Sequence, residues 1–308
     1  MKKVNFKDYI MWTFTHLALI LNVLIVLTPI SWMILASFSK GKLLSGVKLP
    51  IDAITNFFRF NFSSAFESFK VWSSNLTFEH YKYLVEYKAT TDQVFSDYAE
   101  AFSTTLFIAV LNTILVVALS SLVGFAFSRY KFKGKKGVLL TLMGLQMFPS
   151  FMGMIALFMM YRQFGLLNSP VALTLIYVTG SIPYNTFIIR GFMKNIPKSL
   201  DEAAAIDGAS NLQIMTKIII PLAVPIMGFV AVNAFMGPWM DFILPSVIMP
   251  QRETLAVWLF TLMDPKASTY SPLDFMAGAL VIAIPIMLVQ MYMQKYVVYG
   301  LTAGADKG

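Results

Sequence analysis

Hydrophobic residues gather in long runs along this 308-residue chain, and short polar segments separate the runs. A helix needs roughly 20 predominantly apolar residues to cross the hydrocarbon core of a bilayer. Six runs reach that length. They predict membrane-spanning helices over about 14–37, 102–127, 137–160, 170–190, 222–247 and 274–294. The fourth run is the weakest because Gly180, Pro183 and Asn185 interrupt it, although neighbouring helices can re-satisfy a broken backbone.

Composition supports an all-α integral membrane protein with several spans. Hydrophobic residues make up 57% of the chain and charged residues only 13%, whereas soluble domains carry about 25% charged residues. Lys2, Lys3 and Lys7 precede the first run and give it the look of a signal peptide. The run extends to Phe38, however, which is too long for such a signal, and no cleavage pattern ends it. We therefore interpret the first run as a retained span.

The charge distribution predicts cytoplasmic N- and C-termini. With both ends inside, the inner segments hold 14 of the 24 Lys and Arg residues and only 5 of the 16 Asp and Glu residues. The densest basic stretch, RYKFKGKK at 129–136, then lies in a short inner loop, where the positive-inside rule is most reliable. The net charge of +8 is thus explained by topology, and no nucleic-acid partner is expected.

This topology divides the chain into four parts. They are a first segment and span (1–37), an extracytoplasmic segment (38–101), a core of five spans (102–294) and a cytoplasmic tail (295–308). The extracytoplasmic segment contains LPIDAITNFFRF and LTFEHYKYLVEY, which predict short helices at the membrane interface. The core includes an outer loop at 248–273. Outer segments of this length either contact an external partner or merely cap the bundle, and the pattern favours neither.

Catalytic and metal sites are not expected. The chain has no cysteine, and its two histidines, His16 and His80, are far apart in sequence. No paired carboxylates, histidine cluster or Ser/His arrangement suggests a membrane enzyme. The polar residues inside the runs are interpreted as interhelical hydrogen-bonding groups rather than ligand contacts. They are Asn22, Asn112, Gln146, Asn185 and Asn233.

The energy source of a transporter with this sequence is expected to lie on another chain. Ion-coupled carriers usually place ionisable groups inside the membrane, and here the runs are almost free of charge; Asp241 falls towards the end of the fifth run. The chain also lacks the G-x-x-x-x-G-K-[ST] loop that binds ATP phosphates. If ATP drives the protein, a separate ATPase must bind it with magnesium, and no cofactor is expected here.

A polar segment between the fourth and fifth runs, SLDEAAAIDGASNLQIMTKIIIP at 199–221, predicts a pair of short helices. Pro197 disfavours helix in the residue before it, and Ser199 with Glu202 three positions later matches a capping box. Gly208 permits a sharp turn, Ser210 can cap a second helix, and Pro221 lies where that helix meets the next span. We interpret 199–220 as a stiff cytoplasmic elbow. An ordinary re-entry loop is the alternative.

The elbow resembles the cytoplasmic signature E-A-A-x-x-x-G-x₉-I-x-L-P of the permease subunits of ABC importers. The matching residues are Glu202, Ala203, Ala204, Gly208, Ile218 and Pro221, with Ile220 in place of the usual Leu. FSRYKFKGKK, QMFPSFMGMIALFMMYRQFG and the final YGLTAGADKG are similar to the smaller permeases of maltose/maltodextrin importers. Asp306 departs from the usual form of that tail. The resemblance covers about residues 100–308.

This resemblance implies a type I importer fold with six spans in a bacterial cell membrane. It implies three protein partners: a second, larger permease, an ABC ATPase dimer and an extracytoplasmic sugar-binding protein. The substrate is expected to be an oligosaccharide of the maltodextrin or galacto-oligosaccharide kind, because the outer loop after the fifth span is long. No residue of this chain is assigned to the sugar, which the larger permease mainly holds in such systems.

The resemblance also assigns contact residues. The ATPase-coupling residues would be Glu202, Ala203, Ala204, Asp207, Gly208 and Pro221. A small, flexible tail including Leu301, Thr302, Ala303 and Gly304 would reach the ATPase, and a loop including Asp264, Pro265, Lys266 and Tyr270 would contact the binding protein. The rival hypothesis is an ion-coupled secondary carrier or channel that works without an ATPase.

Overall fold

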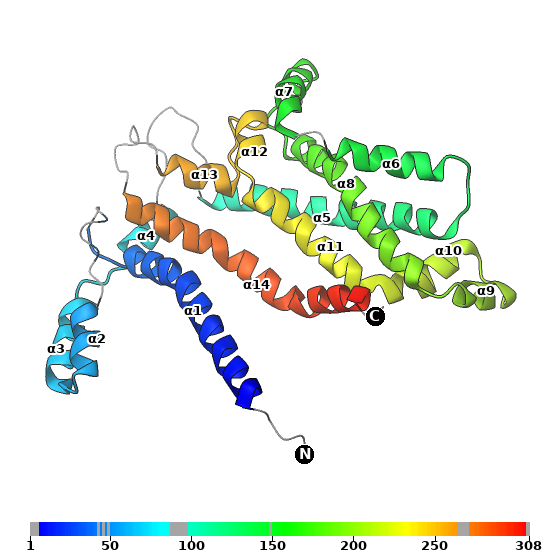
Figure 1. The fold of residues 1–308 in the computed structure, drawn as a ribbon. Coiled ribbons are helices and arrows are strands. Elements are labelled where there is room, and N and C mark those ends of the chain that lie inside the picture. Colours follow the sequence, from blue (N-terminus) through cyan, green and yellow to red (C-terminus); the bar gives the residue numbers. More distant parts are fainter. Residues whose placement is uncertain are drawn as a thin grey trace. The chain divides into compact units, whose positions relative to one another are not determined.

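The structure is a computed structural model and describes residues 6–41, 44, 47, 50–86, 98–147, 150–263 and 271–305, without the side chains of 6–10, 150–151 and 295–305. Helices dominate this part of the chain (Figure 1). Within it, one isolated antiparallel bridge joins Ser39 to Leu76. The helices are α1 (Phe6–Ser37), α2 (Ile51–Phe58), α3 (Phe62–Ser73), α4 (Glu79–Glu86), α5 (Tyr98–Arg129), α6 (Lys135–Leu145), η2 (Ser150–Gly153), α7 (Met154–Gln163), α8 (Pro170–Asn195), α9 (Ser199–Ile206), α10 (Asn211–Ile214), η3 (Met215–Ile219), α11 (Ile220–Met240), α12 (Ile243–Ile248), α13 (Leu255–Thr261) and α14 (Pro272–Ala305).

Five stretches of the described residues are helical, long and apolar enough to cross a membrane. They are Met11–Ser37, Tyr98–Arg129, Pro170–Asn195, Asn211–Met240 and Pro272–Gln294. Each coincides with one of the predicted spans. The fourth predicted span is a continuous helix despite Pro183. The Gln146 side chain donates to the Gly180 carbonyl of this helix, with 2.9 Å between Nε2 and O.

The third predicted span, 137–160, is not one helix. It is divided into α6, the 3₁₀ turn η2 and α7. The sequence FPS at 148–150 falls at the division. Proline disfavours helical backbone in the residue before it and has no N–H to donate. The run is long enough for a span, and Pro149 favours a break in the helix at this point.

The fifth predicted span, 222–247, also has different ends. The helix stops at Met240, and Asp241 is extended with φ −78° and ψ 127°. The Asp241 carboxylate accepts hydrogen bonds from the backbone N–H of Ile243 (2.9 Å) and Leu244 (3.4 Å), at the start of the separate helix α12. A short acceptor side chain at this position competes with helix continuation, as aspartate commonly does at turns and caps.

The chain forms two compact units, which are described separately. The first comprises residues 1–87 and 259–281, and the second comprises 88–258 and 282–308. The core of the second unit lies where α5 packs along α8 and α11. Buried Val116, Ile189 and Val230 belong to one apolar cluster there. Small α5 residues allow the close approach, as is usual between membrane helices; a Cβ on Gly124 would lie 2.9 Å from Ile189 Cγ2.

The predicted role of the polar residues in the spans is confirmed for two of them. The Asn112 amide donates from α5 to the Ala234 carbonyl of α11 (2.7 Å), and Gln146 reaches α8 as described above. The prediction is wrong for Asn185 and Asn233, whose amides donate to carbonyls one turn earlier in their own helices. Asn22 is exposed on α1. A polar side chain within a helix can satisfy itself locally when no neighbouring carbonyl is in reach.

The first unit joins the end of α1 to α4 and to the start of α14. His80 on α4 is buried, with Nδ1 2.6 Å from Asp274 Oδ1 and Nε2 2.9 Å from the Ser39 carbonyl oxygen. The Tyr81 hydroxyl is 2.7 Å from Ser37 Oγ. In contrast, the α1 side chains from Phe14 to Ser31 are exposed. Among the described residues of the segment 38–101, α2, α3 and α4 lie ahead of the start of α5 at Tyr98, and the sequence predicted α2 and α4.

Candidate functional site: the elbow at 197–221

The elbow begins where α8 ends. Asn195 is the last α8 residue, and Ile196 is extended with φ −67° and ψ 126° immediately before Pro197. This is the backbone conformation that a following proline favours. Ile196 remains packed in the main apolar cluster of the second unit. The predicted end of the helix before Pro197 is confirmed, and Ile196 anchors this end in the core of the second unit.

The predicted capping box at Ser199 is wrong. Ser199 is already helical, Lys198 before it has helical backbone (φ −69°, ψ −22°), and the start of α9 has no side-chain cap. The first turn starts at Pro197 instead, whose carbonyl accepts from the Leu200 N–H at 3.4 Å. Proline is well suited to a first helical turn because its φ is already fixed near the helical value.

The turn between the two elbow helices has the predicted glycine geometry. Gly208 has φ +83°, a left-handed conformation that costs other L-residues about 1–2 kcal/mol. The Gly208 N–H donates to Ala205 and the Ala209 N–H to Ala204, which closes the end of α9. Asp207 directly precedes this turn and is exposed. The predicted turn at Gly208 is confirmed, and the left-handed backbone explains why glycine suits this position.

The second elbow helix begins with a complete capping box. The Ser210 hydroxyl accepts from the Gln213 N–H (3.3 Å), and the Gln213 side chain accepts from the Ser210 N–H (2.8 Å). Ser210 is therefore the cap that the sequence predicted. The helix then continues through the π-helical turn η3 into α11, with Pro221 in the first turn of α11. It is not a separate helix, because Asn211–Met240 forms one continuous candidate span.

An arginine on α5 holds the first elbow helix in place. Arg129 Nε lies 2.7 Å from Asp201 Oδ2, and Arg129 Nη1 donates to the Ile196 carbonyl at 3.2 Å. Both side chains are largely buried, at 6% and 20% exposure. The sequence suggested only that Asp201 favours the helix N-terminus. Its partner was missed because the two residues are 72 positions apart, although Arg129 lies in the basic stretch used to set the topology.

Further cations lie on α6, on α8 and at the start of the elbow. Burial and the neighbouring charges of Arg190, Lys198 and Lys194 lower the pKa of Lys135, whose ammonium donates to the Tyr130 carbonyl at 2.9 Å. Arg190 Nε donates to the Phe127 carbonyl near the end of α5 (3.4 Å). Positively charged side chains therefore gather near the ends of α5 and α8, beside the elbow.

The opposite side of the elbow is exposed and combines acidic and apolar groups. Ala204 and Ala209 pack against the apolar cluster, whereas Glu202, Ala203 and Asp207 are exposed. Ile206 and Leu212 are also exposed, at 87% and 65%. An exposed apolar patch with a polar rim is typical of a protein-binding surface.

The other predicted contact residues lie in the C-terminal part of α14 or outside the described residues. Leu301, Thr302, Ala303 and Gly304 belong to the C-terminal part of α14, so the tail is helical as far as Ala305 rather than flexible as expected, and their side chains lie outside the described residues. Asp264, Pro265, Lys266 and Tyr270 all lie outside the described residues. Their proposed contact with a binding protein stays a prediction.

A cavity in the second unit contains a polar pair that the sequence did not indicate. The cavity has a volume of about 410 Å³ and is lined by residues of α7, α8 and α12. The Tyr177 hydroxyl donates to Asp241 Oδ2 at 2.8 Å on its wall. Within the part of the chain that the structure describes, no three His, Asp or Glu side chains are placed to hold a metal ion.

Comparison with known proteins identifies relatives along the whole chain. Residues 117–302 match the family model "Binding-protein-dependent transport system inner membrane component". The galactooligosaccharides transport system permease protein of Bacillus subtilis is 37% identical over 98% of each chain. The maltodextrin transport system permease protein of the same organism is 35% identical, over 82% of this chain and 87% of its own length.

The fold is similar to that of solved ABC importers. The crystal structure of a bacterial ABC transporter that imports the acidic polysaccharide alginate aligns over 96% of this chain and 99% of the compared chain, with a TM-score of 0.67 and 19% identity. That likeness shows the helical importer-permease fold. With the family match over more than half of the chain and the sequence relatives over nearly all of it, the resemblance noted from the elbow is confirmed. The chain is a multi-pass membrane protein that belongs to the family of binding-protein-dependent transport system inner membrane components, the permease subunits of ABC importers.

Proposed function

We propose that this chain is the smaller of two permease subunits in an ATP-driven importer of an oligosaccharide, of the galacto-oligosaccharide or maltodextrin kind. The observation that carries the proposal is the full-length similarity to a galactooligosaccharides permease protein. Another relative is a maltodextrin transport system permease protein. This family membership favours an ATP-driven importer over an ion-coupled carrier.

In this proposal, the elbow couples the permease to a separate ATPase dimer that binds ATP and magnesium. The support is geometric. Arg129 ties α9 to α5, and Gly208 and the Ser210–Gln213 box fix the turn, so that a force on α9 would pass to the spans. Ile206 and Leu212 would enter an apolar cleft of the ATPase, and Glu202 would meet a basic residue at its edge. This chain itself would be non-catalytic.

The proposed membrane arrangement has six crossings with both termini in the cytoplasm. The α6–η2–α7 segment would make the third crossing as a broken helix. Such breaks occur at membrane depth where neighbouring protein or a water-filled cavity satisfies the backbone. The asymmetry of Lys and Arg supports this arrangement. Because the chain has no cysteine, single cysteines at the two termini, labelled with an impermeant thiol reagent, would test whether both ends share one side.

The first experiment is purification of the chain from the membrane, with mass spectrometry of the proteins that accompany it. We expect a second permease and an ATPase. Glu202→Lys should release the ATPase but keep the second permease, while Glu67→Lys, an exposed acidic position on α3, should release neither. Uptake of labelled galactobiose and maltotriose by the reconstituted complex would then separate the two sugar classes. A chain that purifies alone and still transports sugar would overturn the proposal.

A further inference from the structure

The helical hairpin α2–α3 has an unusual concentration of exposed phenylalanine. Six phenylalanines occur between positions 57 and 69, and their side chains are 50–82% exposed. They are Phe57, Phe58, Phe60, Phe62, Phe66 and Phe69. Nothing in the proposed transport mechanism uses this hairpin. Exposed aromatic surface of this extent normally marks a contact with a partner or a membrane.

The phenylalanines lie on one face of each helix. In α3, Phe62, Phe66 and Phe69 follow the spacing of three and four residues that aligns side chains along a helix. In α2, Ile54, Phe57 and Phe58 fall on one side and Asp52 and Asn56 on another. The two helices pack together, and the Asn56 amide lies 3.4 Å from Ser68 Oγ. The hairpin therefore presents a shared apolar side and a polar side.

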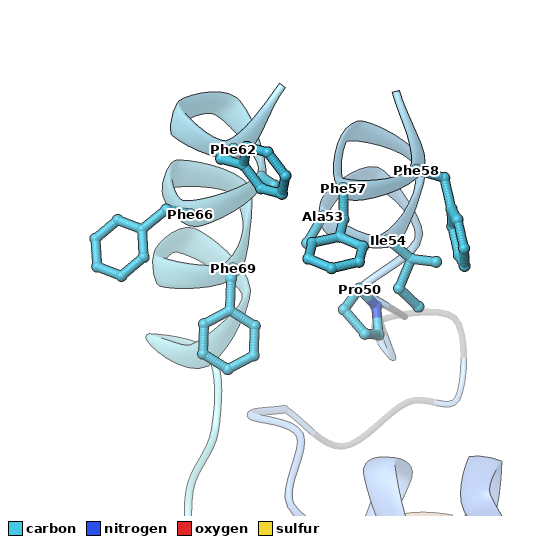
Figure 2. Close-up of a pocket in the computed structure, with 9 residues that line it drawn as sticks. Pro50, Ala53, Ile54, Phe57, Phe58, Phe62, Phe66 and Phe69 are labelled. Carbon is cyan, nitrogen blue, oxygen red and sulfur yellow. The ribbon is translucent and has the colours of Figure 1, made fainter. Parts of the chain in front are cut away.

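A groove of about 590 Å³ opens between the two apolar faces. Figure 2 shows Phe57 and Phe62 in the space between the helices, with ring centroids 5.6 Å apart. Phe58 and Phe66 also line the groove, and in Figure 2 their rings lie on the outer sides of α2 and α3 respectively. The apolar surface therefore extends beyond the groove on both sides, which suits a broad apolar medium better than a single inserted side chain.

The turn of the hairpin adds an independent observation. Phe60 is 82% exposed and has φ +57°, in the left-handed region that glycine adopts easily and phenylalanine does not. The Asn61 N–H donates to the Asn56 carbonyl and the Phe60 N–H to the Phe57 carbonyl, which is the helix-ending pattern that usually contains glycine. An unfavourable backbone conformation at an exposed aromatic residue points to a role for that ring outside the fold.

The base of the hairpin is fixed to the end of the first membrane helix. The Thr77 N–H donates to the Phe38 carbonyl (2.6 Å), and the Lys40 N–H to the Asn75 carbonyl (2.9 Å). These bonds pair the chain leaving α1 with the chain leaving α3. The apolar stretch of α1 has 27 residues, which is about 40 Å of helix and is enough to reach the headgroup region of a bilayer. The hairpin is thus attached at the level of the membrane surface.

We propose that α2–α3 binds the lipid surface, with its phenylalanine face in the interfacial region at the C-terminal end of α1. The exposed face of α1 and the phenylalanine face would then form one continuous lipid-contacting surface. Amphipathic helices with aromatic residues on one face and charges on the other bind membranes in this way. The charges of the hairpin are balanced, with Asp52 and Glu67 against Arg59 and Lys70. Binding therefore depends on apolar burial and does not require anionic lipid.

The absence of cysteine permits a direct test. Single cysteines would replace Phe58, Phe60 and Phe66 on the apolar side, with Ser63→Cys and Glu67→Cys as matched positions on the polar side of the same hairpin. Each full-length variant, together with the subunits that copurify with it, would carry an NBD label in phosphatidylcholine vesicles. Lipid-linked nitroxide and aqueous iodide would then quench the label.

We expect nitroxide to quench the three apolar positions several-fold more strongly than positions 63 and 67, and iodide to show the reverse order. Adding phosphatidylglycerol should leave this pattern unchanged. Equal quenching by iodide at all five positions would overturn the proposal. So would a blue-shifted, iodide-protected label that lipid nitroxide does not quench, because a protein partner would then cover the face. All five replaced side chains are exposed or lie on the surface of the hairpin, so the fold should tolerate these changes.

Discussion

At the scale of single residues, the contacts that matter most are close approaches and buried charges. Gly124 on α5 leaves no room for a side chain, because an added Cβ would lie 2.9 Å from Ile189 Cγ2 and 3.3 Å from the Arg190 nitrogen. A Cβ at Gly144 on α6 would meet nothing within 4 Å. The same chemical change therefore has opposite consequences at the two positions.

We expect Gly124→Ala to destabilise the protein by about 1–3 kcal/mol, because it overpacks a tight helix contact. Gly144→Ala should be neutral or stabilising, since alanine favours helix by up to about 1 kcal/mol over glycine. Thermal unfolding in detergent would measure both. A Gly124→Ala protein as stable as Gly144→Ala would show that α5 and α8 are not in contact as described.

The Arg129–Asp201 pair is the second residue-scale prediction. Replacing Asp201 by Asn leaves the largely buried guanidinium without its carboxylate, and we expect a loss of about 1–3 kcal/mol. ATPase coupling should fall as well, since α9 loses its attachment to α5. The check is sugar uptake per ATP hydrolysed in the reconstituted complex. Unchanged coupling in a folded complex would mean that the ion pair does not position the elbow.

At the scale of elements, the elbow is defined by its turn. Gly208→Ala places a Cβ on a backbone with φ +83°, and we expect a cost of about 1–2 kcal/mol, from strain alone because the site is open. Gly191→Ala in α8 is the matched control, with open space and no positive φ. The strain should distort the elbow and weaken ATPase retention in the pull-down. If both variants retained the ATPase equally well, the turn geometry at Gly208 would not be needed for binding the ATPase.

Element boundaries show where sequence reasoning succeeded and failed. Five runs of apolar residues gave helices, because the cost of unsatisfied backbone in lipid leaves few other structures. The run at 137–160 gave α6, η2 and α7 instead of one helix, since hydropathy is insensitive to the backbone restriction near Pro149. At Ser199 the capping pattern was present, but the turn at Pro197 and Lys198 leads into the helix, so Ser199 is already helical and does not cap it. The Ser210 cap was predicted correctly because no competing signal precedes it.

At the scale of the whole chain, the His80–Asp274 pair joins segments 194 positions apart within the first unit. The hydrogen bond with Asp274 is the largest cause that raises the pKa of His80, ahead of the Ser39 carbonyl and the Asp274 and Glu79 charges, while burial acts in the opposite direction. A histidine whose folded pKa is raised above 6.5 stabilises the fold most below the unfolded value. That stabilisation is lost as the pH rises through the folded pKa.

We therefore expect the melting temperature of the protein to decline as the pH is raised above about 6.5, the ordinary pKa of histidine. His80→Gln should be less stable below that pH and should lose most of the decline. The imidazole of His16, which is exposed on α1, gives the control variant His16→Gln, with the decline retained. A wild-type melting temperature that is flat across this range would contradict the assigned role of the pair.

The sequence by itself determined the helical membrane class, the five candidate spans found among the described residues and the position of the elbow, because these depend on local hydrophobic length, turn chemistry and a distinctive motif. It also contains the motifs that resemble the permease subunits of ABC importers, a resemblance that the relatives confirmed. Only the tertiary structure decided which polar groups meet: Arg129 with Asp201, His80 with Asp274 and Tyr177 with Asp241. It likewise decided that the phenylalanines of α2 and α3 form one face. These contacts join residues that no local pattern connects, and they exist only when packed helices bring distant parts of the chain within hydrogen-bonding range.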